Sequence, residues 1–120
     1  MGSADNALTA LILVRSGGQR WALPRAAVQR IARREQAMPV PALVTLLGLA
    51  TADEPLALWL AMDDHSRAVS ISEVALIAAP TLPLPGLLTG RVHPAVAAVV
   101  VYDDMVLPLL DAAWIVAHRT

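Results

Sequence analysis

The chain has 120 residues, a formal net charge of −1 and no cysteine. This length suits a single domain with a sizeable core, the missing cysteines exclude disulfides and thiolate catalysis, and the near-neutral charge predicts no general attraction to nucleic acid. Hydrophobic residues make up 57% of the sequence, but no apolar run approaches the ~20 residues of a membrane helix, and no signal peptide is recognisable. We therefore expect a cytoplasmic protein without membrane insertion, whose apolar excess suggests a face covered by a partner or a second copy.

The N-terminal part of the chain predicts a β-hairpin. Residues 8–14 are apolar and β-branched enough to form a strand, the Gly-Gly pair at 17–18 supplies a turn, and residues 19–23 return as the partner strand. Because side chains alternate along a strand, Trp21 and Leu23 are expected on the same face.

The next segment is ambiguous by pattern alone. Residues 24–36 begin with a proline and carry apolar residues at helical spacing, which favours a helix. The prolines within 39–41 end this segment, since residues before proline avoid the helical region. Residues 42–48 suit a short helix that Gly48 closes.

The middle of the chain predicts three further strands. Residues 56–62 form an apolar strand, Asp63 and Asp64 supply a turn, and residues 65–72 alternate in the way that is typical of a half-exposed strand. Residues 73–79 are apolar, and Pro80 stops them.

A second hairpin is predicted near the C-terminus over residues 95–111. Two apolar runs flank an Asp-Asp pair at 103–104, which is expected to turn the chain so that Tyr102 faces Met105. The run 96–101 has no polar side chain, and we expect it to be covered on both faces.

The segment before this hairpin and the one after it are simpler. Residues 80–94 carry four prolines and two glycines, so they predict a loop with at most one short extended piece. Asp111 can cap a short helix over 112–118, with Ala112 and Ile115 packed inward.

Three groups of residues, in this order, resemble the CheW-like domain of bacterial chemotaxis adaptors. They are the Gly-Gly hairpin with Trp21-Ala22-Leu23-Pro24 and Ala27-Val28-Gln29-Arg30-Ile31, then Pro39-Val40-Pro41 with Leu46-Leu47-Gly48, and finally Ser70-Ile71-Ser72-Glu73-Val74 with Val106-Leu107-Pro108-Leu109-Leu110-Asp111. The likeness spans nearly the whole chain. Each motif is mostly hydrophobic, so their order and spacing carry the resemblance.

The sequence also departs from the family pattern. After its glycine near Gly48 the family has an Asn-Leu-Arg-Gly segment, a strand and a Pro-Val-x-Asp-Leu stretch, whereas residues 49–54 pass almost directly to the next strand. Because this segment is so short, a strand pair and its connection are expected to be missing from the first subdomain. In addition, a glutamate of the family motif is Arg30 here, and an aspartate is Ser72.

The resemblance implies an all-β, mainly antiparallel fold of small SH3-like barrels in one CheW-like domain over 1–120. The first subdomain, formed by 1–55 with the C-terminal segment of the chain, is expected to be reduced, and 56–111 is expected to form a complete second barrel. It also implies a helical turn near 25–29 and then a strand, against the local helical pattern. The other short helices are expected near 42–48 and 112–118.

No constellation of residues predicts catalysis, a cofactor or a metal site. His65, His93 and His118 are scattered without metal-ligand spacing. The acidic pairs at 53–54, 63–64 and 103–104 are expected to be solvated turn residues, since an acid–base dyad needs environments that separate the two pKa values.

The remaining candidates concern binding. The basic cluster of Arg25, Arg30, Arg33 and Arg34 is more typical of a solvated face than of a nucleic-acid surface, although arginine is also favoured at protein interfaces. Trp59 lies in an apolar strand and is expected in the core.

The function that the resemblance implies is a non-enzymatic adaptor that binds a chemotaxis-type histidine kinase, a chemoreceptor or both, with partner surfaces on barrel edges and in the groove between subdomains. The expected interface residues are Val28, Arg30, Ile31, Leu46 and Leu47. The alternative is a homodimer or other assembly module that uses exposed barrel edges, without receptor–kinase coupling.

Overall fold

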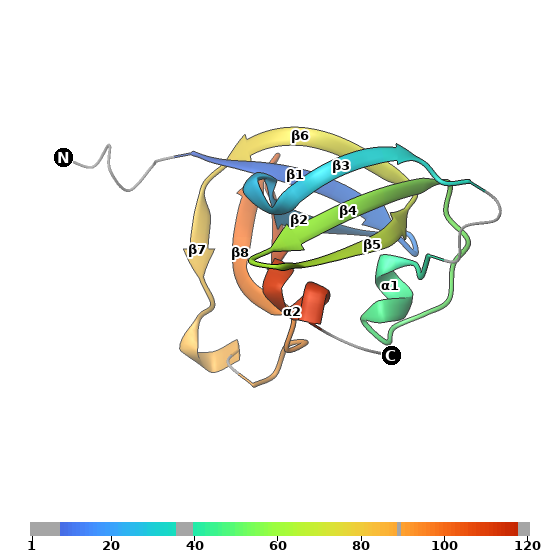
Figure 1. Ribbon diagram of the computed structural model, residues 1–120. Coiled ribbons are helices and arrows are strands. Elements are labelled where there is room, and N and C mark those ends of the chain that lie inside the picture. Colours follow the sequence, from blue (N-terminus) through green and yellow to red (C-terminus); the bar gives the residue numbers. More distant parts are fainter. Residues whose placement is uncertain (1–7, 36–39, 89, 118–120) are drawn as a thin grey trace.

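The computed structural model describes residues 8–35, 40–88 and 90–117. Nearly all regular structure within these residues is β-strand, which confirms the all-β prediction (Figure 1). The strands are β1 (Thr9–Ser16), β2 (Gln19–Pro24), β3 (Val28–Arg33), β4 (Leu56–Met62), β5 (His65–Ile71), β6 (Glu73–Ala79), β7 (Thr81–Pro83), β8 (Val96–Tyr102) and β9 (Met105–Leu110).

Six of these strands form a sheet that closes on itself. Its order is β6-β1-β2-β9-β8-β7, and β7 follows β6 directly along the chain after Pro80. The two ends of the sheet are therefore one bent segment, and at the bend the amide of Val101 donates to the carbonyl of Pro80 at 3.2 Å, which extends the β7–β8 pairing. This closure makes a small barrel of the SH3-like kind, in agreement with the resemblance.

The other three strands form an open sheet in the order β3-β4-β5 beside the barrel (Figure 1). Strand β5 leads into β6 through Ser72, whose amide and hydroxyl both donate to the carbonyl of Arg15, at 2.8 and 3.0 Å. This pair of hydrogen bonds fixes the point where the chain passes from the open sheet to the barrel.

The main hydrophobic core lies between the outside of the barrel and the open sheet. Strands β1 and β2 supply Ile12 and Leu23 from one side, and β4 and β5 supply Leu58 and Ile71 from the other. All four side chains are buried. A second, smaller core fills the barrel interior. Its buried members are Leu11, Ala22, Ala79, Val100 and Leu107.

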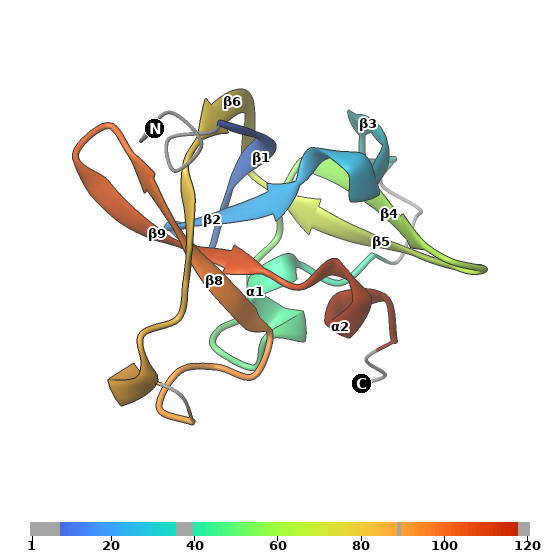
Figure 2. The same cartoon turned by 90° about the vertical axis from the view of Figure 1, so that its left-hand side faces the viewer.

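The expectation that residues 96–101 are covered on both faces is wrong. In β8, Val100 points into the barrel and is fully buried, but Val101 is 37% exposed on the outside. The strands between two cores are instead β1 and β2, because the open sheet packs against their outer face. The hairpin of β8 and β9 projects away from this contact (Figure 2).

The local prediction for the hairpin itself is confirmed. Tyr102 pairs with Met105, and both Asp103 and Asp104 have positive φ, of 52° and 61°. This is the backbone that a two-residue type I′ turn requires.

The ambiguous segment follows the resemblance and not the helical pattern. A 3-10 turn, η2 (Arg25–Ala27), leads into β3, which pairs with β4. Tertiary pairing thus overrides local helical spacing in a short segment. Residues 36–39, where the helical pattern would have ended, lie outside the described residues.

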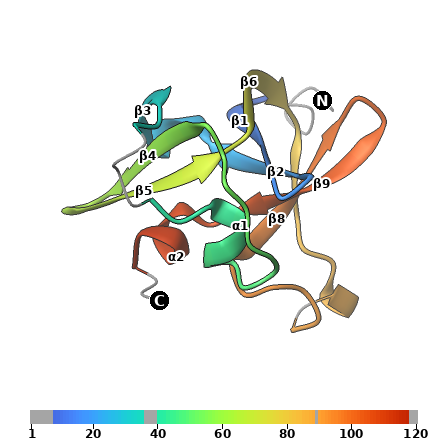
Figure 3. The same cartoon turned by 90° about the vertical axis from the view of Figure 1, so that its right-hand side faces the viewer.

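The predicted short helices are present with tighter bounds. They are α1 (Leu43–Leu46) and α2 (Ala112–Ala117), and a further 3-10 turn, η3 (Gly86–Leu88), lies in the proline-rich loop. The carboxylate of Asp111 accepts from the amide of Ala113 at 2.9 Å, as expected of a cap. Figure 3 shows α1 and α2 on the same side of the molecule. The predicted end of the last helix, His118, lies outside the described residues.

The half-exposed prediction for residues 65–72 holds only for the first half of β5. Val69, Ser70 and Ile71 are all fully buried, because the segment before α1 covers the other face. The amide of Ser70 donates to the carbonyl of Pro41 at 2.8 Å, which fixes this cover.

The two sheets both take strands from either side of residue 55. The barrel contains β1 and β2 together with β6 to β9, and the open sheet contains β3 together with β4 and β5. The division into a reduced subdomain 1–55 and a second barrel 56–111 stays a prediction.

Candidate functional site

A groove of about 300 Å³ runs between β3 of the open sheet and β6 of the barrel. Its floor includes the buried Ile12 of β1, and its walls carry the partly buried Val28 and Ile31. The side chain of Leu76 is 66% exposed at the rim. The other lining residues are Arg25, Gln29, Arg30, Val74 and Ala75. An open groove with an apolar floor and an exposed leucine is typical of a protein-binding surface.

The charges at this groove have one sign. Arg25 and Arg30 line it and are both exposed, while none of the acidic residues that the structure describes does. Arg33 is exposed at the end of β3, whereas Arg34 forms an ion pair with Asp53. The groove therefore presents an apolar floor with a cationic rim, which favours a partner that carries apolar and acidic side chains.

Arg30 also borders a second hollow of about 350 Å³, together with Gln29 and Trp59. Its guanidinium carbon lies 4.1 Å from the centroid of a Trp59 ring, in a cation–π stack. The β3–β4 register shifts between Val28 and Arg30, and such a bulge changes the direction of the side chains that follow it. The expectation that Trp59 is a core residue is wrong: it is only partly buried, and it belongs to neither core.

The structure brings three of the five expected interface residues together. Val28, Arg30 and Ile31 all line the groove. Leu46 and Leu47 do not: they are only 2% and 3% exposed, and they pack in the main core. In this structure no partner can contact these two leucines directly.

No sequence pattern points to the wall contributed by β6 or to Arg25 as a lining residue. The pattern of residues 74–76 predicts only a strand, although a run as apolar as 74–79 exceeds what one buried face needs. Leu76 in particular lies opposite Ile12 in the β1–β6 ladder, on the outside of the barrel. That β3 lies on the other side of the groove from Leu76 is visible only in the fold.

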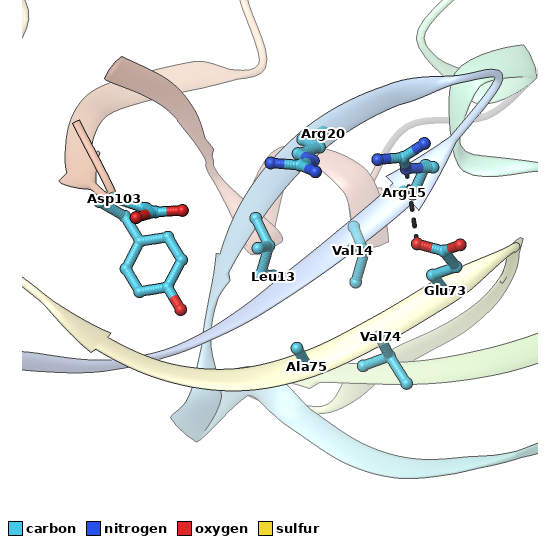
Figure 4. Close-up of a pocket in the computed structure, with 9 residues that line it drawn as sticks. Leu13, Val14, Arg15, Arg20, Glu73, Val74, Ala75 and Asp103 are labelled. Carbon is cyan, nitrogen blue, oxygen red and sulfur yellow. Dashed lines mark ion pairs between the residues drawn. The ribbon is translucent and has the colours of Figure 1, made fainter. Parts of the chain in front are cut away.

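A different hollow of about 260 Å³ opens at one end of the barrel, beside Leu13 and Asp103 (Figure 4). Arg15 and Arg20 lie on one side of it, and Glu73 reaches Arg15 from β6, with a nitrogen–oxygen distance of 3.5 Å. Its charges are of both signs and partly neutralise one another. We regard it as a weaker candidate than the groove for this reason.

A buried polar cluster joins the first hairpin to α1 and to the loop before β4. The carboxylate of Glu54 accepts from the hydroxyl of Ser16 at 2.5 Å and from the amide of Gly17 at 3.1 Å. The Ser16 hydroxyl in turn accepts from the amide of Val44 at 3.0 Å. Every partner here is a hydroxyl or a backbone amide, so the cluster is a structural clamp and not an acid–base pair.

This cluster corrects the expectation that residues 53–54 form a solvated acidic pair. The side chain of Asp53 is 87% exposed, but Glu54 is only 5% exposed. Gly17 explains the tight approach of the hairpin: its φ is +61°, and a Cβ there would lie 2.8 Å from a methyl of Val44. The pairs at 63–64 and 103–104 are exposed turn residues, as expected.

His93 has a structural role. Its Nδ1 accepts from the amide of Ala95 at 3.0 Å, so Nε2 carries the proton and donates to the carbonyl of Leu47 at 2.7 Å. The ring also meets Trp114 edge-on at 5.2 Å. His93 thus fastens the proline-rich loop to the end of α1 and to α2.

None of the described helices is long and apolar enough to cross a membrane. Within residues 8–35, 40–88 and 90–117, no group of three or more histidine or acidic side chains is placed to hold a metal ion.

Comparison with known proteins supports the fold. No family model and no curated protein matches the sequence. Twelve chains of solved structures do match, among them the scaffolding protein TtCheW from Thermoanaerobacter tengcongensis, with a TM-score of 0.67 and 11% identity over 90% of this chain and 92% of that one. At this identity the likeness shows the fold alone, and the chain has a CheW-like fold.

Proposed function

We propose that this chain is a non-enzymatic adaptor in bacterial chemotaxis-type signalling, which binds a histidine kinase, a chemoreceptor or both. The fold likeness to a scaffolding protein over nine-tenths of the chain supports the adaptor class. The observation that carries the binding part is the β3–β6 groove, where Leu76 is 66% exposed beside Val28 and Ile31. An exposed leucine over an apolar floor is stabilised when a partner covers it.

Val28, Arg30 and Ile31 are the proposed contact residues, now joined by Arg25 and Leu76. Apolar residues with arginine are the composition that protein interfaces favour. Because residues 49–54 stand where the family pattern has a longer segment, we propose that the chain binds one of the two partners more strongly than the other.

Calorimetric titration of the chain against each partner separately tests the proposal. The partners are the regulatory domain of a chemotaxis-type kinase and the signalling tip of a chemoreceptor. The expected result is binding to at least one, with an affinity that falls as salt is added, because the groove rim is cationic. Absence of binding to both at high micromolar concentration would remove the adaptor proposal.

The alternative is a self-assembling module, and one surface favours it. On the outside of β7 to β9, Leu82 is 48% and Val106 is 68% exposed, with Val101 beside them. Sedimentation of the chain at micromolar concentration distinguishes the two: a strict monomer that binds a kinase or receptor excludes self-assembly as the function.

A further inference from the structure

The groove is lined by strand edges and not by a sheet face. Residues 28–31 of β3 and residues 74–76 of β6 all contribute to it, without a gap in either run. Side chains alternate along a strand, so a face contributes every second residue, whereas an edge contributes consecutive ones. The groove therefore follows the edges of β3 and β6.

Both edges are free of strand partners among the described residues. β3 ends the three-stranded sheet and pairs only with β4. β6 pairs only with β1, because the barrel closes beyond it, where the chain bends at Pro80 into β7. A free edge presents a row of backbone N–H and C=O groups, which is a template for one more strand. Here two such edges border the same groove.

From this geometry we infer that the partner enters the groove as an extended segment that adds a β-strand to β3 or β6, and that this segment carries alternating apolar and acidic side chains. The inference rests on the proposed function, because it specifies how the same groove recognises its partner. Backbone pairing supplies affinity in this mode, and alternate side chains supply specificity.

The side chains around the groove select the chemistry of the added strand. On one side of such a strand, apolar residues meet the floor at Ile12 and the walls at Val28 and Ile31. On the other side, its residues reach the exposed Arg25 and Arg30, and within the described part of the chain no acidic residue lines the groove to compete for them. β3 has six residues, so a segment of about the same length, roughly 20 Å, covers its edge.

The arginines also argue against a second copy as the occupant. Charged side chains on an edge strand discourage pairing with a like strand, because like charges then lie opposite each other. β3 carries Arg30 and Arg33 and no acid, so two copies of β3 repel. The charges at this edge therefore favour pairing with a strand that carries acidic side chains over pairing with a second copy of β3.

The test uses a synthetic peptide of about ten residues, alternating valine and glutamate, titrated into the full chain. It is compared with the same peptide carrying lysine for glutamate, and with two versions N-methylated either at the valines or at the glutamates. Each N-methylated version lacks the N–H donors along one edge of the strand. We expect the glutamate peptide to bind and the lysine peptide not to, and at least one N-methylated version to bind about tenfold more weakly.

The location of binding is read from amide hydrogen exchange, which is expected to slow in β3 and β6. The double variant R25E/R30E is expected to reverse the preference between glutamate and lysine peptides, whereas Arg91→Glu, at an exposed arginine outside the groove, leaves it unchanged. Absence of binding, or binding that neither N-methylation pattern weakens, overturns strand addition. The kinase and receptor titrations can still succeed in that case, so the two failures are distinguishable.

Discussion

Replacing Trp21 with alanine is expected to lower the free energy of unfolding by about 4 kcal/mol, because its indole fills the space between the barrel and the open sheet. The side chain is 5% exposed and belongs to the main core. Its buried N–H has no hydrogen-bond partner among the described residues, so the loss is one of packing alone. Chemical denaturation followed by circular dichroism measures the change.

Trp59 provides the matched control, since it is a tryptophan on β4 of the open sheet and lies outside both cores. Trp59→Ala removes mainly the stack with Arg30 and is expected to cost about 1 kcal/mol. Equal losses for the two tryptophans would contradict the placement of Trp59 on the outside of the open sheet.

Replacing Glu54 with alanine is expected to cost about 2 to 3 kcal/mol of unfolding free energy. The change leaves the buried hydroxyl of Ser16 and the amide of Gly17 without their acceptor, and the buried hydroxyl accounts for most of the expected loss. Ser16→Ala is expected to cost a similar amount, since it also removes the acceptor for the amide of Val44. Both variants are measured by urea denaturation.

The double variant S16A/E54A decides whether the two side chains act as one unit. Residues that share a hydrogen bond are expected to be coupled by about 1 to 2 kcal/mol, so the double variant loses less than the sum of the single variants. Additive losses would show that the cluster is not a clamp. Asp53→Ala at the neighbouring position is the control: the side chain of Asp53 is 87% exposed, and a change near zero is expected.

Local signals predicted most of the strands because turns and alternation are encoded in short stretches. Strand β4 has the predicted bounds, and the Asp103–Asp104 turn pairs Tyr102 with Met105 as expected. For β3 the helical spacing of the apolar residues predicted a helix, whereas the order of motifs along the whole chain, which resembles the CheW-like family, predicted a strand. A strand of only six residues is too short for its alternation to be recognised in the sequence.

Cover of a face could not be predicted, because it depends on which element arrives from far along the chain. Ser70 is buried by the segment before α1, and Glu54 is buried by the first hairpin, 38 residues away from it at Ser16. Val101 is exposed because the open sheet covers β1 and β2 instead of β8. An apolar run shows that a strand can be covered, but not that it is.

The candidate site could likewise be predicted only in part from the sequence. The motif that resembles the CheW-like family led to Val28, Arg30 and Ile31, which lie together at the groove. It led equally to Leu46 and Leu47, whose side chains the fold places in the core. The opposite wall of the groove, with Leu76, lies more than 40 residues further along the chain and has no motif of its own.

The central claim is that the groove between β3 and β6 is the surface that holds the partner. The most direct measurement compares Leu76→Asp with Val106→Asp in titrations against the kinase domain or receptor tip that the unaltered chain binds. The two side chains are 66% and 68% exposed, so neither change is expected to disturb folding, and only Leu76 lies at the groove. The claim predicts at least about tenfold weaker binding for Leu76→Asp and unchanged binding for Val106→Asp; loss of binding in Val106→Asp alone would contradict it and would place the partner on the β8–β9 hairpin.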